Sequence, residues 1–446
     1  MHVVSDLSWD SADECSKPLR RSVIAPVLIV RGCGGASGRY RCEHTSEQLA
    51  SRGIACEIRD IECPEGVLVE ALFARTILLQ RVPFSPLIDS LIRFAELAGS
   101  LVIFETDDLT FDLDAIEHIH HLATLEPEAR ERQRASFLLQ AETFKRCRLA
   151  LASTDPIADA VRRVGQVAFV HRNGYSSEMA KLAGEAIARA TAKRNGNGHN
   201  MQWPVWLGYF SGTHTHNLDF AAIAPVLMEV LCRYPSVRLR IVGPVKIDDA
   251  FRDFGDRIER LDAVDWRRLP DLISSVDINL APLESENCFC DAKSEVKYIE
   301  AGLVGIPTVA TATPAFRYAI TPSVNGFVAD SIKDWPKLLT DLIENPALRH
   351  RLGAAARKHV IQNYAPESRA STLVAFLEEA RADQDSKSLG LSPLPTIVNE
   401  TLRESLRAMS VSICEHNRSW GSLSHVSRRA WDLLRKRLGE RLASIR

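Results

Sequence analysis

The sequence contains no long run of apolar residues and carries almost no net charge. Its 446 residues include 55 Lys and Arg against 57 Asp and Glu, a formal net charge of −2, so no global field would attract nucleic acid. No segment approaches the ~18 apolar residues of a membrane-spanning helix. The polar, acidic first residues resemble neither a signal peptide nor an anchor. We therefore expect a cytoplasmic protein without a nucleic-acid partner.

Paired cysteines and metal-binding spacings are also lacking. The 10 cysteines stand singly, mostly within apolar stretches, which is typical of reduced, buried thiols. Only Cys288 and Cys290 are close together, and zinc would need further ligands at suitable spacing. His118, His120 and His121 do not have the spacing of a His-Glu-x-x-His site. We predict that the protein binds no metal ion.

Short β-branched runs alternate with longer amphipathic segments along most of the chain. Residues 27–30, 55–61, 75–82 and 101–106 form one set of expected strands, and a second set follows a polar, Gly- and Asn-rich stretch. This alternation predicts an α/β fold with two Rossmann-like domains facing across a cleft. The predicted division is a disordered tail (1–22), an N-terminal domain (23–190), a linker (191–202), a C-terminal domain (203–365), a helix returning toward the N-terminal domain (366–385) and a basic helical extension (386–446).

The basic extension has an amphipathic pattern. Its apolar residues share one helical face and its arginines crowd elsewhere; the apolar set is Trp431, Leu434, Leu438, Leu442 and Ile445. Such a helix can lie on an anionic membrane surface. Alternatively, it packs on the protein or on a partner and keeps its arginines in water. Peripheral membrane contact therefore stays one of two interpretations.

The segment from Lys293 to Pro307 is the strongest indication of a ligand site. Ser294 is expected to cap a helix that starts at Glu295, so the helix amides and dipole would face an anion. Lys293 stands at the same place, and a nucleotide leaving group needs such positive charge. Glu300, further along, is placed to accept hydrogen bonds from a ribose diol. The alternative is that Glu300 and Lys297 lie on the exposed face of an amphipathic helix.

This segment, with Tyr209 to Thr213, Val242-Gly243 and Asn325-Gly326-Phe327, resembles the C-terminal domain of the group 1 (family 4) glycosyltransferases. The resemblance implies the GT-B fold, a nucleotide-sugar substrate held mainly by the C-terminal half, and a saccharide, lipid-linked or small-molecule acceptor at the N-terminal half. It implies neither a cofactor nor a metal, and transfer with retention. The Lys-Ser-Glu variant is similar to a branch associated with bacterial surface-polysaccharide assembly.

The resemblance also assigns roles within the donor site. Glu300 corresponds to the second glutamate of the Glu-x7-Glu element, which binds the ribose, whereas the first glutamate would fall at Ala292. His214 and His216 stand where many relatives offer Arg and Lys to the diphosphate, so either these histidines or Lys246 and Lys293 supply the charge. The predicted donor-binding residues are Gly34, Gly35, Ser211, Gly212, Thr213, His214, Gly243, Lys246, Ser294, Glu295 and Glu300.

Two segments of the N-terminal half are expected to face the same cleft. The loop Gly32 to Arg41 approximates Gly-x-Gly-x-x-Gly, with Ser37 in the third glycine's place and Glu57 near the end of the next strand. It is interpreted as an NAD fingerprint, as a structural turn, or, by the resemblance, as a cleft loop that directs Arg39 at the diphosphate or acceptor. Asp107 ends another strand, where it binds the acceptor, acts as a base or caps a turn.

The residues together favour a glycosyltransferase, with Lys293, Glu300, Arg39 and Asp107 as candidate catalytic residues. Two other functions stay open. One is an NAD-dependent oxidoreductase that uses the Gly32 to Gly38 loop. The other is a non-catalytic GT-B scaffold, which Ala292 and the missing Arg and Lys pair would fit.

Overall fold

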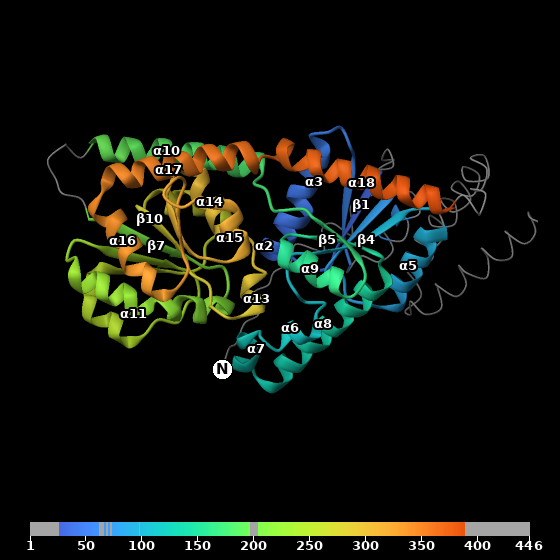
Figure 1. Cartoon of the computed structure of the whole chain (residues 1–446), viewed down its shortest axis with the longest axis horizontal. Helices are drawn as coiled ribbons and strands as arrows, with labels where there is room; N and C mark the ends of the chain where they lie inside the picture. Colours follow the sequence, from blue (N-terminus) through green and yellow to red (C-terminus); the bar gives the residue numbers. More distant parts are fainter. Residues whose placement is uncertain are drawn as a thin grey trace, which may run out of the picture.

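The computed structural model describes residues 26–388, apart from residues 62–66, 68–69, 72–73, 98 and 197–203. Two lobes lie side by side along the long axis, and each is built around a parallel sheet with helices on both faces (Figure 1). The predicted α/β architecture of two Rossmann-like halves is therefore confirmed. The predicted tail, part of the predicted linker and the basic extension with Trp431 lie outside the described residues.

The N-terminal lobe contains a six-stranded sheet in the order β2-β1-β3-β4-β5-β6. Every pairing is parallel, and β1 and β3 are almost fully buried, as expected for strands covered on both faces. The four expected strands at its start are all present. The strands are β1 (Val27–Arg31), β2 (Cys56–Asp60), β3 (Thr76–Gln80), β4 (Leu101–Thr106), β5 (Leu149–Ala152) and β6 (Val167–Val170).

The helices of this lobe begin with an irregular element. The glycine loop continues into α2 (Gly35–Gly38), a π-helical turn η1 (Arg39–Glu43) and α3 (His44–Ala50). Single π-turns are rare and occur often at functional sites. The others are α5 (Pro86–Leu97), α6 (Leu113–Ile116), α7 (His120–Thr124), α8 (Pro127–Arg146) and α9 (Asp155–Arg163).

The C-terminal lobe contains a second six-stranded parallel sheet in the order β12-β11-β10-β7-β8-β9. Its strands are β7 (Trp206–Phe210), β8 (Arg238–Val242), β9 (Ile258–Leu261), β10 (Ile278–Ala281), β11 (Thr308–Thr311) and β12 (Phe327–Ala329). Its main helices are α11 (Asn217–Arg233), α12 (Leu269–Ser274), α13 (Cys288–Asp291), α14 (Val296–Leu303), α15 (Pro314–Ala319), α16 (Trp335–Glu344) and α17 (Pro346–Asn363), joined by the short turns η2 (His214–His216), η3 (Asp249–Arg257), η4 (Trp266–Arg268) and η5 (Ile332–Asp334).

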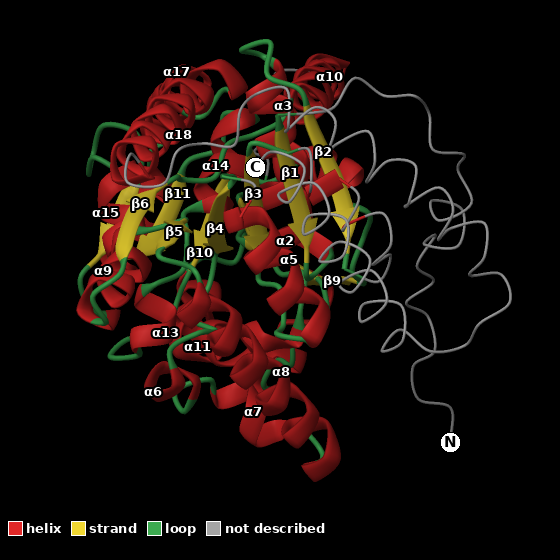
Figure 2. Ribbon diagram, turned by 90° about the vertical axis from the view of Figure 1, so that its right-hand side faces the viewer, coloured by secondary structure: helices red, strands yellow, loops and turns green. Residues whose placement is uncertain are grey.

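Two long helices connect the lobes. α10 (Ser177–Gly196) follows the last strand of the N-terminal sheet but packs on α12 of the C-terminal lobe. α18 (Pro366–Ser388) runs from the C-terminal lobe back to the N-terminal lobe and packs on α3. Its Phe376 also stacks on Phe169 of β6, with ring centroids 4.4 Å apart. Figures 1 and 2 show α10, α17 and α18 along the same side of the molecule. The helices therefore join the lobes along one side.

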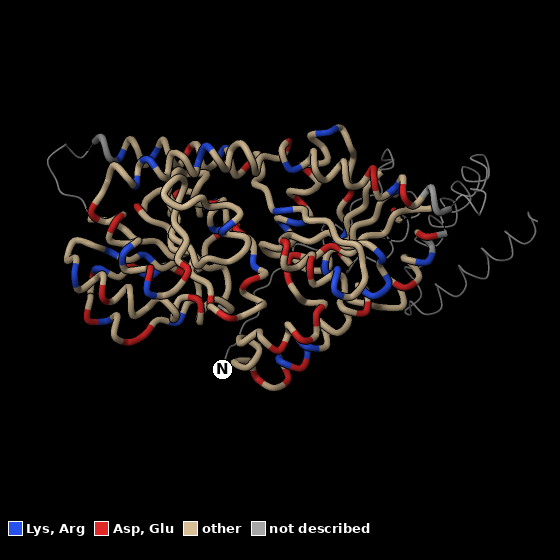
Figure 3. Tube along the Cα trace, in the orientation of Figure 1, with Lys and Arg blue, Asp and Glu red and all other residues tan. Residues whose placement is uncertain are grey.

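Charged residues are interspersed over both lobes rather than separated by sign (Figure 3), which agrees with the small net charge. Within the part of the chain that the structure describes, no helix is both long enough and apolar enough to cross a membrane.

Candidate active site between the two lobes

The start of α14 lies at the junction of the lobes, but its cap differs from the prediction. The helix begins at Val296, its N-cap is Glu295, and no side chain caps it. The predicted cap by Ser294 is therefore wrong, because its hydroxyl instead accepts a 2.9 Å hydrogen bond from Asn173 of the N-terminal lobe. Ser294 thus contributes a contact between the lobes at the place where the sequence predicts an anion.

The side chain of Glu295 faces the protein interior. Its residue is fully buried, the Tyr364 hydroxyl donates a 2.9 Å hydrogen bond to its carboxylate, and the Arg172 guanidinium lies 3.8 Å away. Burial raises the pKa of Glu295, and Arg172 opposes this effect. Any contact between Glu295 and a ligand at the helix start would therefore involve its backbone amide.

Lys293 reaches from the C-terminal lobe to the N-terminal lobe. Its Nζ lies 2.7 Å from Oδ1 of Asp108, and both side chains are largely buried. Asp107, next to it, lies 3.4 Å from the Arg81 guanidinium. Burial alone would raise the pKa of Asp107, but Arg81 and further donors outweigh it and hold that pKa below its usual range. The structure thus brings the predicted residues Lys293 and Asp107 to the same acidic strand end of the N-terminal sheet.

Glu300 lies one helical turn further along α14 and also faces the N-terminal lobe. Its Oε1 accepts a 2.9 Å hydrogen bond from the Tyr40 hydroxyl, and Nη2 of Arg39 lies 3.9 Å away. The Arg39 guanidinium stacks on the Trp266 indole, 4.7 Å from the ring centroid. Burial raises the pKa of Glu300, whereas Arg39, Tyr40 and Lys297 oppose this rise. Arg39 and Glu300, both predicted site residues, are therefore brought together.

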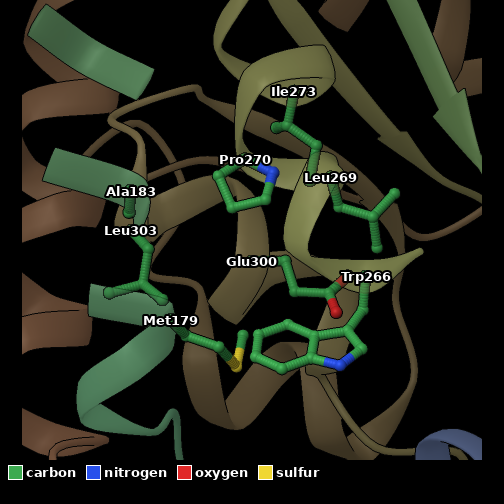
Figure 4. A pocket seen from close by; sticks show the side chains of 8 residues that line it. All are labelled: Met179, Ala183, Trp266, Leu269, Pro270, Ile273, Glu300 and Leu303. Carbon is green, nitrogen blue, oxygen red and sulfur yellow. The ribbon is translucent and has the colours of Figure 1, made fainter. Parts of the chain in front are cut away.

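A mostly apolar recess adjoins the Glu300 carboxylate. Figure 4 shows the carboxylate beside the Trp266 indole, with the other lining side chains around them. The lining residues are Met179, Ala183, Trp266, Leu269, Pro270, Ile273, Glu300 and Leu303. A flat aromatic ring next to a hydrogen-bond acceptor can hold a group that has an apolar face and a hydroxyl-bearing edge.

The turn after β7 holds three of the predicted donor-binding residues, Ser211 to Thr213. Ser211 is buried and its hydroxyl donates a 2.9 Å hydrogen bond to the Thr213 carbonyl, whereas Gly212 and Thr213 are exposed. Gly243 supports this turn, because it has φ of 106° and a Cβ there would lie 1.8 Å from the Ser211 carbonyl oxygen. Glycine is therefore required at position 243 on steric grounds.

Two further predicted residues lie near this turn. His214 begins η2, and its side chain is outside the described part of the structure. Lys246 is exposed, and its backbone amide donates a 2.9 Å hydrogen bond to the Asn217 side chain. The Lys246 side chain therefore lies on the exposed edge of the candidate site.

Lys297 is a site residue that sequence reasoning left undecided. Its Nζ is buried, has no hydrogen-bond partner among the described residues, and lies 4.1 Å from the centroid of the Tyr209 ring. Burial lowers its pKa to about 8, against the effect of the Asp219 and Glu300 carboxylates. The sequence contained one indication that Lys297 belongs to the site: a residue three positions before Glu300 lies on the same helical face. The exposed-face alternative is therefore wrong for Lys297.

His216 is held by a neighbouring carboxylate. Its Nδ1 lies 2.7 Å from Oδ2 of Asp219, and the other oxygen of Asp219 accepts a 2.9 Å hydrogen bond from the Glu284 amide. Burial lowers the pKa of His216, while Asp219 opposes this shift. His216 is thus oriented by Asp219.

A buried polar network behind the π-helical turn was not foreseen. Arg41 is 1% exposed and contacts Glu105 at 2.5 Å, the His171 carbonyl at 2.8 Å and the Asn173 side chain at 2.9 Å. Burial raises the pKa of Glu105 to about 7, although Arg41 opposes this. Because Asn173 also donates to Ser294, the network links the end of β4 to the start of α14.

The glycine loop has the conformation of a tight turn. Gly34 is the N-cap of α2, and Gly35 has φ of 65°. In the NAD interpretation, the acid at the end of β2 would bind a ribose. The acid that ends β2 is Asp60, which is 2.5 Å from Arg31, whereas Glu57 lies earlier in the strand and pairs with Arg59 at 3.1 Å. The geometry therefore does not favour a dinucleotide at this loop.

No group of three or more His, Cys, Asp or Glu side chains that could hold a metal ion is found among residues 26–388 where these are described. The described site contains a buried carboxylate, a buried ammonium, an ion pair between the lobes and the β7 turn. This set can hold an anionic group beside a hydroxylated one.

Residues 225–375 match the family described as Glycosyl transferase-like. Over 163 residues the chain is 23% identical to a GDP-mannose-dependent monoacylated alpha-(1-6)-phosphatidylinositol monomannoside mannosyltransferase of Corynebacterium glutamicum. That match covers 35% of this chain and 43% of the relative, so the chain spans less than half of that protein.

Solved structures share the fold over most of the chain. HepE of Anabaena, determined in complex with UDP and glucose, superposes with a TM-score of 0.53 at 14% identity, covering 80% of this chain and 100% of that one. Sucrose-phosphate synthase of Thermosynechococcus elongatus superposes with a TM-score of 0.55 at 13% identity, with the same two coverages of 80% and 100%. The expected GT-B fold and the resemblance of the C-terminal half to group 1 glycosyltransferases are confirmed.

Proposed function

Since the chain has the GT-B fold and its residues 225–375 form a glycosyl transferase-like domain, we propose that it is a glycosyltransferase. It transfers a sugar from a nucleotide-sugar to an acceptor hydroxyl, with retention of anomeric configuration. The acceptor is a saccharide, lipid-linked or small molecule bound on the N-terminal lobe. Assembly of a cell-surface polysaccharide or glycoconjugate is the process that this proposal favours.

The observation that carries the proposal is the position of Glu300 at the edge of an apolar recess. Its carboxylate lies beside the Trp266 indole, and it already accepts a hydrogen bond from one hydroxyl group, that of Tyr40. A nucleoside offers the same two features, an apolar ring face and a ribose diol. The start of α14 lies about one turn before Glu300 on the same helix, and a diphosphate attached to that ribose would reach toward it and toward the β7 turn.

During the proposed reaction, negative charge builds up on the leaving nucleoside diphosphate. The bond between the anomeric carbon and the diphosphate oxygen breaks, and a bond from that carbon to the acceptor oxygen forms on the same face. The acceptor proton passes to the departing diphosphate. Backbone amides of the Ser211 to Thr213 turn and of the α14 start would stabilise the negative charge. Asp107 and Asp108 lie on the opposing lobe, where Asp108 pairs with Lys293, and they would border the transferred sugar and the acceptor.

The printed names of the similar proteins support a nucleotide-sugar donor. One relative is described as GDP-mannose-dependent, and one structural neighbour holds UDP and glucose. These names differ in the base, so both bases belong in the test.

The test measures release of sugar from a panel of UDP- and GDP-sugars in the absence of acceptor, together with thermal stabilisation by UDP and GDP. We expect at least one nucleoside diphosphate to stabilise the protein and Glu300→Ala to abolish this stabilisation. The control is Glu128→Ala, a carboxylate whose side chain is 92% exposed on α8, and it should behave as the wild type. No stabilisation by either diphosphate, or equal stabilisation of Glu300→Ala, would refute the proposal.

A further inference from the structure

The ammonium group of Lys297 is buried without a hydrogen bond. Its Nζ has no hydrogen-bond partner among the described residues and lies 4.1 Å from the centroid of the Tyr209 ring. A charged donor that loses water and gains no acceptor destabilises a folded protein. A cation–π contact offsets only part of this cost. The position is therefore one at which a ligand acceptor would be strongly favoured.

The acidic groups near Lys297 are engaged with other donors. Asp219, from α11, accepts from His216 and from the Glu284 amide, at 2.7 and 2.9 Å. Glu300, on α14 itself, accepts from Tyr40 at 2.9 Å. These carboxylates act on the ammonium through space without a hydrogen bond to it.

The other candidate cations of the site either have partners or are exposed. Arg39 lies 3.9 Å from the Glu300 carboxylate and stacks on the Trp266 indole. Lys293 pairs with Asp108 across the lobes at 2.7 Å, and Lys246 is exposed at the rim. His216, from η2, is oriented by Asp219, and burial lowers its pKa. A protonated imidazole is therefore disfavoured at the place where the sequence suggests a replacement for a missing Arg or Lys.

The position of Lys297 fits a diphosphate. Tyr209, under its ammonium, is the fourth residue of β7, and the turn from Ser211 to Thr213 follows that strand. Lys297 also precedes Glu300 by three residues on the same helical face. A diphosphate that joins a ribose at Glu300 to the amides of the turn would therefore pass the Lys297 ammonium.

We propose that Lys297 is the fixed cation of the donor site, which binds the diphosphate of the nucleotide-sugar and stabilises it as the leaving group. Lys293 instead joins the two lobes on the side of Asp108. This inference rests on the proposed glycosyltransferase function. It assigns to Lys297 the positive charge that the β7 turn itself does not supply. The cation comes from α14 itself, as the second residue of its first turn.

The experiment compares Lys297→Met with Lys358→Met, a matched change at an exposed lysine on α17. Affinity for UDP and GDP is measured by calorimetry, and Tm is measured without ligand. Loss of a hydrogen-bonded charge predicts affinity for the preferred diphosphate about 10- to 100-fold weaker in Lys297→Met. Because the unpaired ammonium is removed, Tm of the unliganded variant should equal or exceed that of the wild type. Lys358→Met should change neither quantity.

Two results would overturn the inference. Lys297→Met could bind the diphosphate as tightly as the wild type, or it could lose affinity together with a lowered unliganded Tm, which would indicate a structural role. Lys297→Gln, which keeps a polar donor, provides a second variant for the same comparison if the Met variant does not fold. Failure of the wild type to bind either diphosphate would instead refute the proposed function, and this inference with it.

Discussion

The Tyr40 hydroxyl of the N-terminal lobe donates a 2.9 Å hydrogen bond to the Glu300 carboxylate of the C-terminal lobe. The two residues are 260 positions apart in the sequence. This contact makes the ionisation of the predicted ribose-binding group depend on how the lobes meet. It also gives a direct way to test that group.

Tyr40→Phe should shift the acidic limit of nucleotide binding to higher pH. The Tyr40 hydrogen bond lowers the pKa of Glu300 and so opposes the rise that burial causes. Without it, the carboxylate takes up a proton at a higher pH, and a protonated acid accepts ribose hydrogen bonds less well. The measurement is the Kd of the preferred nucleoside diphosphate against pH. Tyr234→Phe, which removes a hydroxyl bound to Glu344 on the surface, is the control; an unshifted limit in Tyr40→Phe would contradict the prediction.

The alkaline limit of binding should belong to Lys297. Burial lowers the pKa of its ammonium to about 8, with Asp219 and Glu300 opposing; the nearby His216, whose own pKa is lowered by burial, is neutral in this pH range. The charged form is therefore lost as pH rises through about 8, and diphosphate affinity should fall there. A bound anion would move this limit upward, because it favours the charged form. In Lys297→Met the alkaline loss should vanish, and its persistence would assign the limit to another group.

Gly243→Ala should distort the β7 turn. The new Cβ would lie 1.8 Å from the Ser211 carbonyl oxygen, at a φ of 106° that disfavours any side chain. We expect a loss of at least about 2 kcal/mol in unfolding free energy and weaker diphosphate binding, measured by denaturant unfolding and calorimetry. Gly184→Ala on α10 is the matched control, because its Cβ would meet nothing within 4 Å. That change should stabilise the helix by about 0.5–1 kcal/mol.

The Lys293–Asp108 pair should couple the lobes. The two groups lie 2.7 Å apart with side chains 26% and 17% exposed, so screening by water leaves a modest interaction of about 1 kcal/mol. A double-mutant cycle with Lys293→Met and Asp108→Asn should find this coupling in unfolding free energy. Sugar release should fall in each single variant by more than the stability change explains. A coupling of zero would show that the pair does not join the lobes energetically.

Much of the fold was predictable from local patterns. Strands such as β1 and β3 are short apolar runs bounded by turn residues, and this pattern is set by neighbours in the chain. The place of Glu300 past a helix start was predictable for the same reason. A helix of known direction puts Lys297 and Glu300 on one face, whatever surrounds them.

The partners of these side chains depend on the tertiary structure. Lys293 and Asp108 are 185 positions apart, and Ser294 and Asn173 are 121 apart. No local spacing indicates that Ser294 would be taken by the opposite lobe instead of capping α14. Nor does the sequence indicate that Lys297 would be buried while Lys293 is paired.

The sequence by itself therefore determined the two parallel sheets, their helices and the segment that carries the candidate site, because periodicity and turn chemistry act over a few residues. Only the tertiary structure decided that Lys293 is paired and that the Lys297 ammonium has no hydrogen-bond partner among the described residues. Burial and ion pairing depend on how α14 of one lobe meets the strand ends of the other, and that meeting is set by packing between distant parts of the chain.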